Sequence, residues 1–103
     1  MWAQLITTRI KPGREGDLHK LAEQFQATEQ AGSGLVRSMM MVDQKDPSRL
    51  SIFVVFESEE KARARENDPR RQEGLAEARA LMAEIFDAPP EFVDLTVVEE
   101  MTP

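Results

Sequence analysis

The chain has 103 residues, enough for one domain with a single core and too few for two. Its 41% hydrophobic and 31% charged residues are typical of a folded soluble protein, and the excess of 19 acidic over 13 basic residues disfavours nucleic-acid and membrane partners. The absence of Cys excludes disulfides, thiolate nucleophiles and cysteine-based metal sites. No apolar run could span a bilayer and no secretory signal is visible, so we expect a cytoplasmic protein.

The first part of the chain predicts a strand, a helix and a second strand. Trp2–Ile10 alternates between two faces that are both apolar or neutral, as in a strand covered on both sides. Arg14–Ala31 has apolar residues at three- and four-residue spacing and is expected to end at Gly32 in a left-handed cap. His19 lies beside this apolar stripe, so we expect a surface histidine without a catalytic role. Leu35–Asp43 forms the second strand, with its Met residues on alternate faces.

The most apolar segment of the chain is Leu50–Glu57, which follows a polar turn at Gln44–Ser48 and makes a hairpin with the second strand. Both faces of this segment are apolar, and a domain of this size covers only one face with its own helices. The remaining elements, each opened by a capping or turn signal, are a helix from Ser58 to Asn67, a helix from Asp68-Pro69 to Phe86 and a strand over Phe92–Val98.

The order β-α-β-β-α-β predicts a single α+β domain over residues 1–103, a ferredoxin-like sandwich whose four-stranded antiparallel sheet has the strand order 4-1-3-2. The helices cover one face of this sheet, and the other would expose an apolar patch of a size that monomers rarely have. We therefore expect a homodimer in which two sheets face each other as a dimeric α/β barrel. The residues expected in that interface are Ala3, Leu5, Phe53, Val55, Val93, Leu95 and Val97, with the tail through Met101 reaching the partner.

Short motifs follow one another over nearly the whole chain. They are the Ile10-Lys11-Pro12-Gly13 turn, the helix ending at Gly32, the Asp46-Pro47 turn, Phe56-Glu57-Ser58 and the Asp68-Pro69 helix start. In their order and spacing the chain resembles the antibiotic biosynthesis monooxygenase (ABM) domain family of the dimeric α/β-barrel superfamily. The resemblance implies a homodimer with a pocket in each chain between the sheet and the helices. Members of that family oxygenate polycyclic aromatic substrates without a cofactor, degrade haem, or have no known activity.

The resemblance also implies which side chains form the pocket. The chain has Phe56 where active members tend to have Trp, Ile6 where haem-degrading members have Asn, and Arg70 in place of their axial His. Because Ile cannot hydrogen-bond and Arg is not an iron ligand, we expect no haem, no metal and no other cofactor. The residues expected to contact a substrate are Ile6, Thr8, Phe25, Ser38, Met40, Phe56, Arg70, Gln72 and Met82.

Two functions are compatible with these observations. The first is a cofactor-independent monooxygenase, an oxidoreductase that acts on an aromatic or quinone-like small molecule. The second is a non-catalytic module that binds a small ligand or assembles on the same dimeric fold, because fold does not imply function. A polar pair in the pocket would favour the first, and an interior filled by Phe and Met would favour the second. The basic residues of 61–71 predict a solvated helix surface, whereas Arg70 or Arg71 turned inward would hold a carboxylate.

Overall fold

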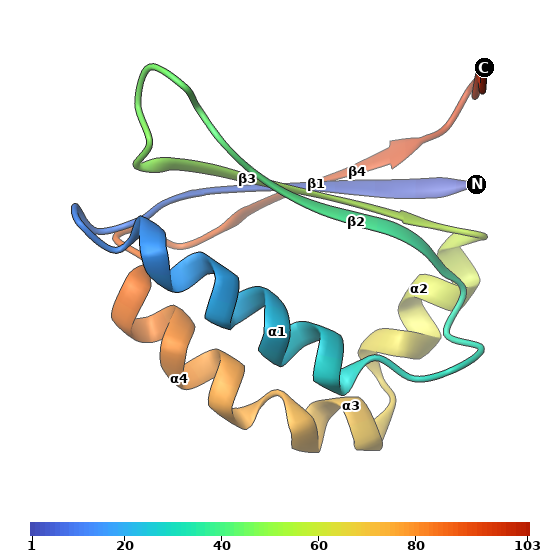
Figure 1. Ribbon diagram of the computed structural model, residues 1–103. Coiled ribbons are helices and arrows are strands. Elements are labelled where there is room, and N and C mark those ends of the chain that lie inside the picture. Colours follow the sequence, from blue (N-terminus) through green and yellow to red (C-terminus); the bar gives the residue numbers. More distant parts are fainter.

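The computed structural model describes residues 1–103 and contains a four-stranded antiparallel sheet with all helices on one face (Figure 1). The strand order β2-β3-β1-β4 is the predicted order read from the other edge, which confirms the ferredoxin-like sandwich. The strands are β1 (Trp2–Arg9), β2 (Leu35–Val42), β3 (Arg49–Phe56) and β4 (Glu91–Thr96). The helices are a 3-10 turn (Glu15–Asp17), α1 (Leu18–Thr28), α2 (Glu59–Glu66), α3 (Pro69–Gly74) and α4 (Ala76–Ile85).

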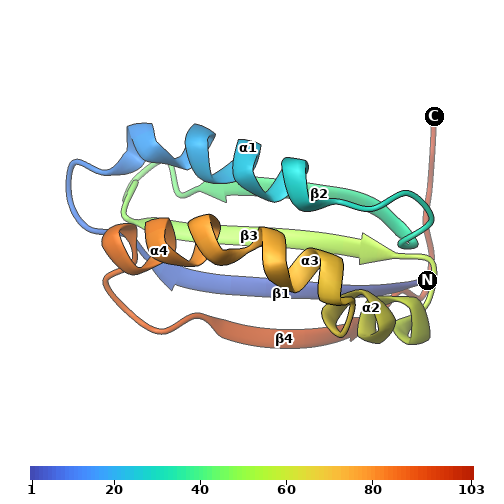
Figure 2. The same cartoon turned by 90° about the horizontal axis from the view of Figure 1, so that it is seen from below.

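The core lies between the sheet and the helices. Seen from the helix side, α1 runs beside α3 and α4, while α2 lies at the end of the sheet where β1 begins (Figure 2). Leu50 of β3 belongs to a larger cluster with α1 and α4, and Phe56 packs with Trp2 and Ala62 in a smaller cluster. Only 14 of the 103 residues are buried, in part because the opposite sheet face has no cover. No helix is long and apolar enough to cross a membrane.

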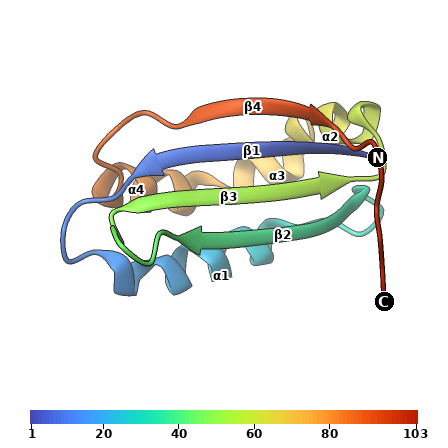
Figure 3. The same ribbon diagram turned by 90° about the horizontal axis from the view of Figure 1, so that it is seen from above.

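The sheet face opposite the helices is bare (Figure 3). Ala3 is only 1% exposed because it lies between Val55 and Leu95 in the neighbouring strands, so it offers little surface to a partner. Met39 and Met41, at 40% and 42% exposure, extend the apolar patch onto β2. The strand registers put these apolar side chains on the bare face: Ala3, Leu5, Met39, Met41, Phe53, Val55, Val93 and Leu95.

The fourth strand is shorter than predicted. β4 ends at Thr96, opposite Trp2, which is the first residue of β1. Val97 therefore lies outside the strand, held only by its N–H to the carbonyl of Met1 at 3.3 Å. The last residues extend on the bare side of the sheet and cross the ends of the strands (Figures 1 and 3), and Met101 is exposed.

The first helix is also shorter than predicted at both ends. The segment before Leu18 forms a separate 3-10 turn, and α1 ends at Thr28 instead of Ala31. The backbone of Glu29 is extended, and its side chain turns toward Arg65 instead of continuing along the helix. The positive φ of Gly32 consequently belongs to the loop before β2 and not to a helix cap.

The segment predicted as one helix from Asp68 to Phe86 consists of two helices that meet at Leu75. Asp68 caps α3 as predicted, since its carboxylate accepts the backbone N–H of Arg70 at 2.9 Å. Gly74, the last residue of α3, lies against α1: a Cβ there would come within 2.9 Å of Cγ2 of Thr28. The missing side chain therefore lets α3 approach the end of α1 closely.

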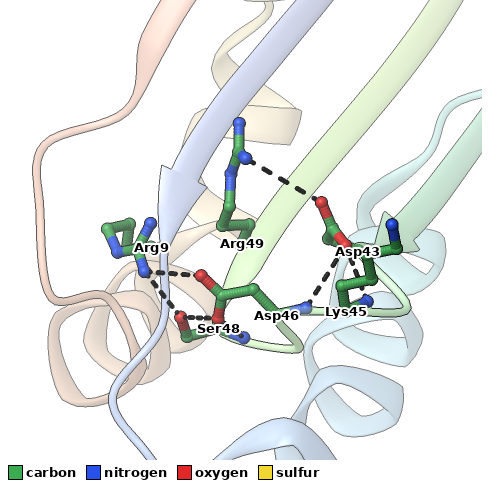
Figure 4. A network of polar contacts seen from close by, with 6 residues as sticks. All are labelled: Arg9, Asp43, Lys45, Asp46, Ser48 and Arg49. Atoms are coloured by element: carbon green, nitrogen blue, oxygen red, sulfur yellow. Dashed lines mark hydrogen bonds and ion pairs between the residues drawn. The ribbon is translucent and has the colours of Figure 1, made fainter.

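A polar network fixes the β2–β3 hairpin to the end of β1 (Figure 4). Arg9 donates to Asp46 at 2.8 Å and to Ser48 at 3.0 Å. Asp43 accepts the backbone N–H of Asp46 at 3.2 Å and lies 3.8 Å from Arg49. This network lies at the opposite end of the sheet from α2 (Figure 1), so it stabilises the scaffold away from that helix.

Candidate ligand-binding site

A cavity of about 330 Å³ lies between the sheet and the helices α1, α2 and α3. All four strands and α1 contribute apolar side chains to the wall of this cavity. Its charged side chains are two arginines and two glutamates, which come from α2, from α3 and from the segment after α1. The apolar lining residues are Ile6, Ala22, Phe25, Leu35, Met40, Ile52, Val54, Phe56 and Phe92. The polar ones are Gln4, Gln26, Glu29, Ser38, Arg65, Glu66 and Arg71.

Five of the residues expected at a substrate line this cavity: Ile6, Phe25, Ser38, Met40 and Phe56. Four of these five are on strands, where residues two apart share a face, so the helix-facing set follows from the alternation of each strand. The register confirms that Met40 points to the helix side, paired with Ile52, while its Met neighbours point away.

Four expected residues lie outside the cavity. The Thr8 hydroxyl donates to the carbonyl of Ala88 at 2.7 Å, so it closes a loop at the other end of β1. Met82 packs against the larger core cluster, because α4 lies over the part of the sheet away from α2. The side-chain amide of Gln72 donates to the last carbonyl of α2. Arg70 is the fourth.

The two arginines at the start of α3 point in different directions. Arg70 folds back on the capping Asp68, with Nη2 donating to the carboxylate at 2.8 Å, and is exposed. Arg71 lines the cavity, and its Nε is buried without a hydrogen-bond partner. Burial, together with the positive charge of nearby Arg65, lowers the pKa of Arg71 from its ordinary value. Arg71 is therefore a cation at the cavity that lacks an anionic partner.

Glu29 and Arg65 form a polar pair at the same end of the cavity. Arg65 donates Nε to Oε1 of Glu29 at 3.2 Å and Nη2 to Oε2 at 2.7 Å, a bidentate geometry, and Ser33 donates its hydroxyl to the same carboxylate at 2.5 Å. Burial raises the pKa of Glu29, but the hydrogen bonds from Arg65 and Ser33 outweigh it and hold this pKa below its ordinary value. The guanidinium of Arg65 also lies 5.3 Å from the centre of the Phe56 ring.

Several residues of this site were not predicted from the sequence. Gln4 could have been found, since it shares the strand face of Ile6. Phe92 could have been found in the same way, because it pairs with Ile6 across β1 and β4. Glu29 gave no such signal, because its position depends on where α1 ends. Arg71 was considered only as an alternative to Arg70, because the choice between them depends on how α3 begins. The structure has no group of His, Cys, Asp or Glu side chains that could hold a metal ion.

No family model matches the sequence, and no curated protein matches it. Solved structures do share its fold. A candidate antibiotic biosynthesis monooxygenase from Nitrosomonas europaea has a TM-score of 0.76 at 13% identity, covering 96% of this chain and 100% of that chain. Another, from Chloroflexus aurantiacus J-10-fl, has a TM-score of 0.68 at 24% identity, covering 99% and 98%. A protein of unknown function from Nitrosomonas europaea has a TM-score of 0.73 at 22% identity, covering 99% of this chain and 93% of that chain.

TM-scores in this range establish a common fold, and the identities, all below 25%, establish no more than the fold. This chain has the ferredoxin-like α+β fold of the solved ABM proteins, as the order of its sequence motifs indicated. The activity has to be argued from the cavity itself.

Proposed function

We propose that the chain is a cofactor-independent monooxygenase that acts on an aromatic or quinone-like small molecule bound between the sheet and the helices. The observation that carries this proposal is an open cavity of about 330 Å³ with apolar walls and a charged end formed by Glu29, Arg65 and Arg71. Its size falls within the range of small-molecule sites, and a few placed polar groups among apolar walls are typical of them. An interior closed by Phe and Met would have favoured a purely structural role.

The proposed chemistry requires a substrate that supplies the electrons itself. In an anthrone-like compound, removal of a proton from the ring CH2 gives a carbanion that reduces O2. The carbon becomes a carbonyl, and the second oxygen atom leaves as water with both hydrogens of the CH2 group. The ring is thereby oxidised by four electrons and O2 is reduced by four, so no further reductant is needed.

The wall residues suit the steps of this reaction. The apolar surface binds the ring and excludes water. The side chains of Ser38 and Gln26, which make no hydrogen bond within the chain, can donate to a ring oxygen as negative charge develops there. Glu66 is the proposed proton acceptor, because its carboxylate makes a single ion pair, with Arg63 at 3.2 Å, whereas that of Glu29 is held by both Arg65 and Ser33 and its pKa is lowered.

The test is oxygen consumption with 1,8-dihydroxyanthrone, followed by an oxygen electrode and by the absorbance of the quinone product. We expect one O2 consumed for each quinone formed, at a rate above the spontaneous reaction, and a lower rate for Glu66→Gln. A rise in melting temperature without accelerated oxidation would instead support the alternative, a non-catalytic ligand-binding module. If the compound does not bind and its oxidation is not accelerated, the monooxygenase and the ligand-binding module are both contradicted.

We also propose that the chain is a homodimer joined through the bare sheet face. The support is the apolar patch that includes Leu5, Phe53 and Val93, together with the extended tail on the same side (Figure 1). A specific interface buries roughly 1,600 Å² in total, and a sheet of this size offers enough surface for it.

Haem degradation is not the proposed function. Ile6 lies in the cavity wall and offers no hydrogen bond, while Arg70 is paired with Asp68 at the surface. We expect titration with haemin to give no sharp, stoichiometric Soret band. A one-to-one complex of micromolar affinity would contradict this expectation.

A further inference from the structure

A second, smaller cavity of about 150 Å³ lies beside the first. Arg65 and Arg71 line both cavities, so these two side chains form the partition between them. The other walls come from residues 30–33 after α1 and from the turn between α2 and α3. An elongated ligand could therefore occupy both spaces by passing along the two arginines.

The second cavity is strongly basic in a chain whose net charge is −6. Its charged lining consists of Lys61, Arg65, Arg70 and Arg71 with a single carboxylate, that of Asp68. Arg71 differs from the other three because it has no carboxylate partner. The ion pairs of the others are Lys61 with Glu57, Arg65 with Glu29 and Arg70 with Asp68.

The unpaired guanidinium of Arg71 lies where the two cavities meet. Its Nε is buried and makes no hydrogen bond, and burial disfavours its charge. Arg71 is half-buried, so an anion placed against its guanidinium would offset the cost of removing part of this charge from water. An arginine fork matches the two oxygens of a carboxylate and binds them bidentately.

We propose that the ligand carries an anionic arm, a carboxylate or similar oxyanion, that pairs with Arg71 at the partition and directs the arm into the second cavity. The inference rests on the proposed function, since the aromatic part of the same molecule occupies the first cavity. Arg71 then determines specificity for acidic over neutral aromatic compounds. The charge of Glu29 acts on this cation, but Glu29 makes no ion pair with it, because Arg65 and Ser33 occupy its carboxylate.

Two probes of the same shape test this proposal by calorimetry: anthraquinone-2-carboxylate and its neutral carboxamide. We expect the carboxylate to bind the wild type at least roughly tenfold more tightly than the carboxamide, as for a charge-assisted bidentate pair. Arg71→Gln should abolish that preference and leave carboxamide affinity within about twofold. Arg79→Gln is the matched control, because it removes the same charge from a side chain that lines neither cavity.

Every outcome of this experiment decides a point. Equal affinity of the two probes for the wild type overturns the anionic arm but leaves the proposed function standing. Equal weakening of both probes by Arg71→Gln also overturns it, since the guanidinium would then contact the ring portion. Binding of neither probe removes the support for the proposed function. If Arg71→Gln does not fold, Arg71→Lys keeps the charge without the fork and should reduce the preference for the carboxylate.

Discussion

The contact between α3 and α1 allows a prediction with a defined magnitude. Gly to Ala in a helix usually stabilises by roughly 1 kcal/mol. At Gly74 the added Cβ would come within 2.9 Å of Cγ2 of Thr28. Thr28 is 6% exposed, and its hydroxyl donates to the carbonyl of Phe25 at 2.8 Å, so its side chain cannot rotate away without losing that hydrogen bond.

Overpacking of this kind costs about 1–3 kcal/mol, which exceeds the gain in helix propensity. We therefore expect Gly74→Ala to lower the free energy of unfolding by about 1 kcal/mol. Thr28→Ser removes the methyl group that the new Cβ would meet. In that background the same substitution should be neutral or stabilising, and the double-mutant cycle should give a favourable coupling of roughly 1–2 kcal/mol.

The assay is urea unfolding followed by circular dichroism, with all variants at one protein concentration. Gly16→Ala is the control, because a Cβ there meets nothing within 4 Å. Stabilisation of the wild type by Gly74→Ala, or a coupling below about 0.3 kcal/mol, would refute the reasoning. Since Gly74 follows Arg71 within α3, the variant should also weaken binding of the acidic probe by displacing that side chain.

Three further predictions concern single side chains. Phe53→Glu would put an unpaired carboxylate on the bare sheet face, so this variant should sediment as monomer or aggregate. The wild type should sediment as a dimer. A monomeric wild type at tens of micromolar would contradict the interface. Because the pKa of Glu29 is lowered in the folded chain, its contribution to stability is present above the unfolded pKa and is lost as pH falls through the folded one. Glu29→Gln should therefore flatten the loss of unfolding free energy below roughly pH 4.5, and an unchanged slope would count against the Glu29–Arg65 pair. His19 is exposed, so His19→Ala should change stability by less than about 0.5 kcal/mol in urea unfolding.

The sheet and its topology follow from local patterns. Side chains two apart along a strand share a face, and this rule is consistent with the positions of Ile6, Met40 and Phe56 at the cavity, two of which the family resemblance also implied. The capping residues Ser58 and Asp68 also act as their sequence context predicts, each accepting a backbone N–H at the start of its helix.

The charged end of the cavity follows from contacts that no local pattern contains. Glu29 was expected inside a helix, and it leaves that helix to pair with Arg65, 36 positions away. Arg70 and Arg71 are adjacent residues of the same type, so the sequence does not distinguish them. Arg71 is the one that reaches the cavity, because the side chain of Arg70 pairs with Asp68, the N-cap of α3. The break at Leu75 has only the preceding Gly74 to indicate it, because the segment contains no Pro after Pro69.

The polar network of the β2–β3 hairpin makes one end of the molecule more stable against local unfolding than the other. At the hairpin end, Arg9 of β1 pairs with Asp46 of the hairpin, and Ile10 forms a β-bridge with Phe86. We therefore expect the end of β1 and the end of α4 to unfold together.

At the other end α2 is tied to the edge strand β4, because Arg63 pairs with Asp94 at 2.9 Å. The short α3 makes no hydrogen bond to the sheet, and its side chains bond instead to Asp68 and to the end of α2. Slow amide exchange at the hairpin end and faster exchange in α3 are the expected result. We therefore expect a ligand to enter by displacement of α3, while the sheet keeps its register.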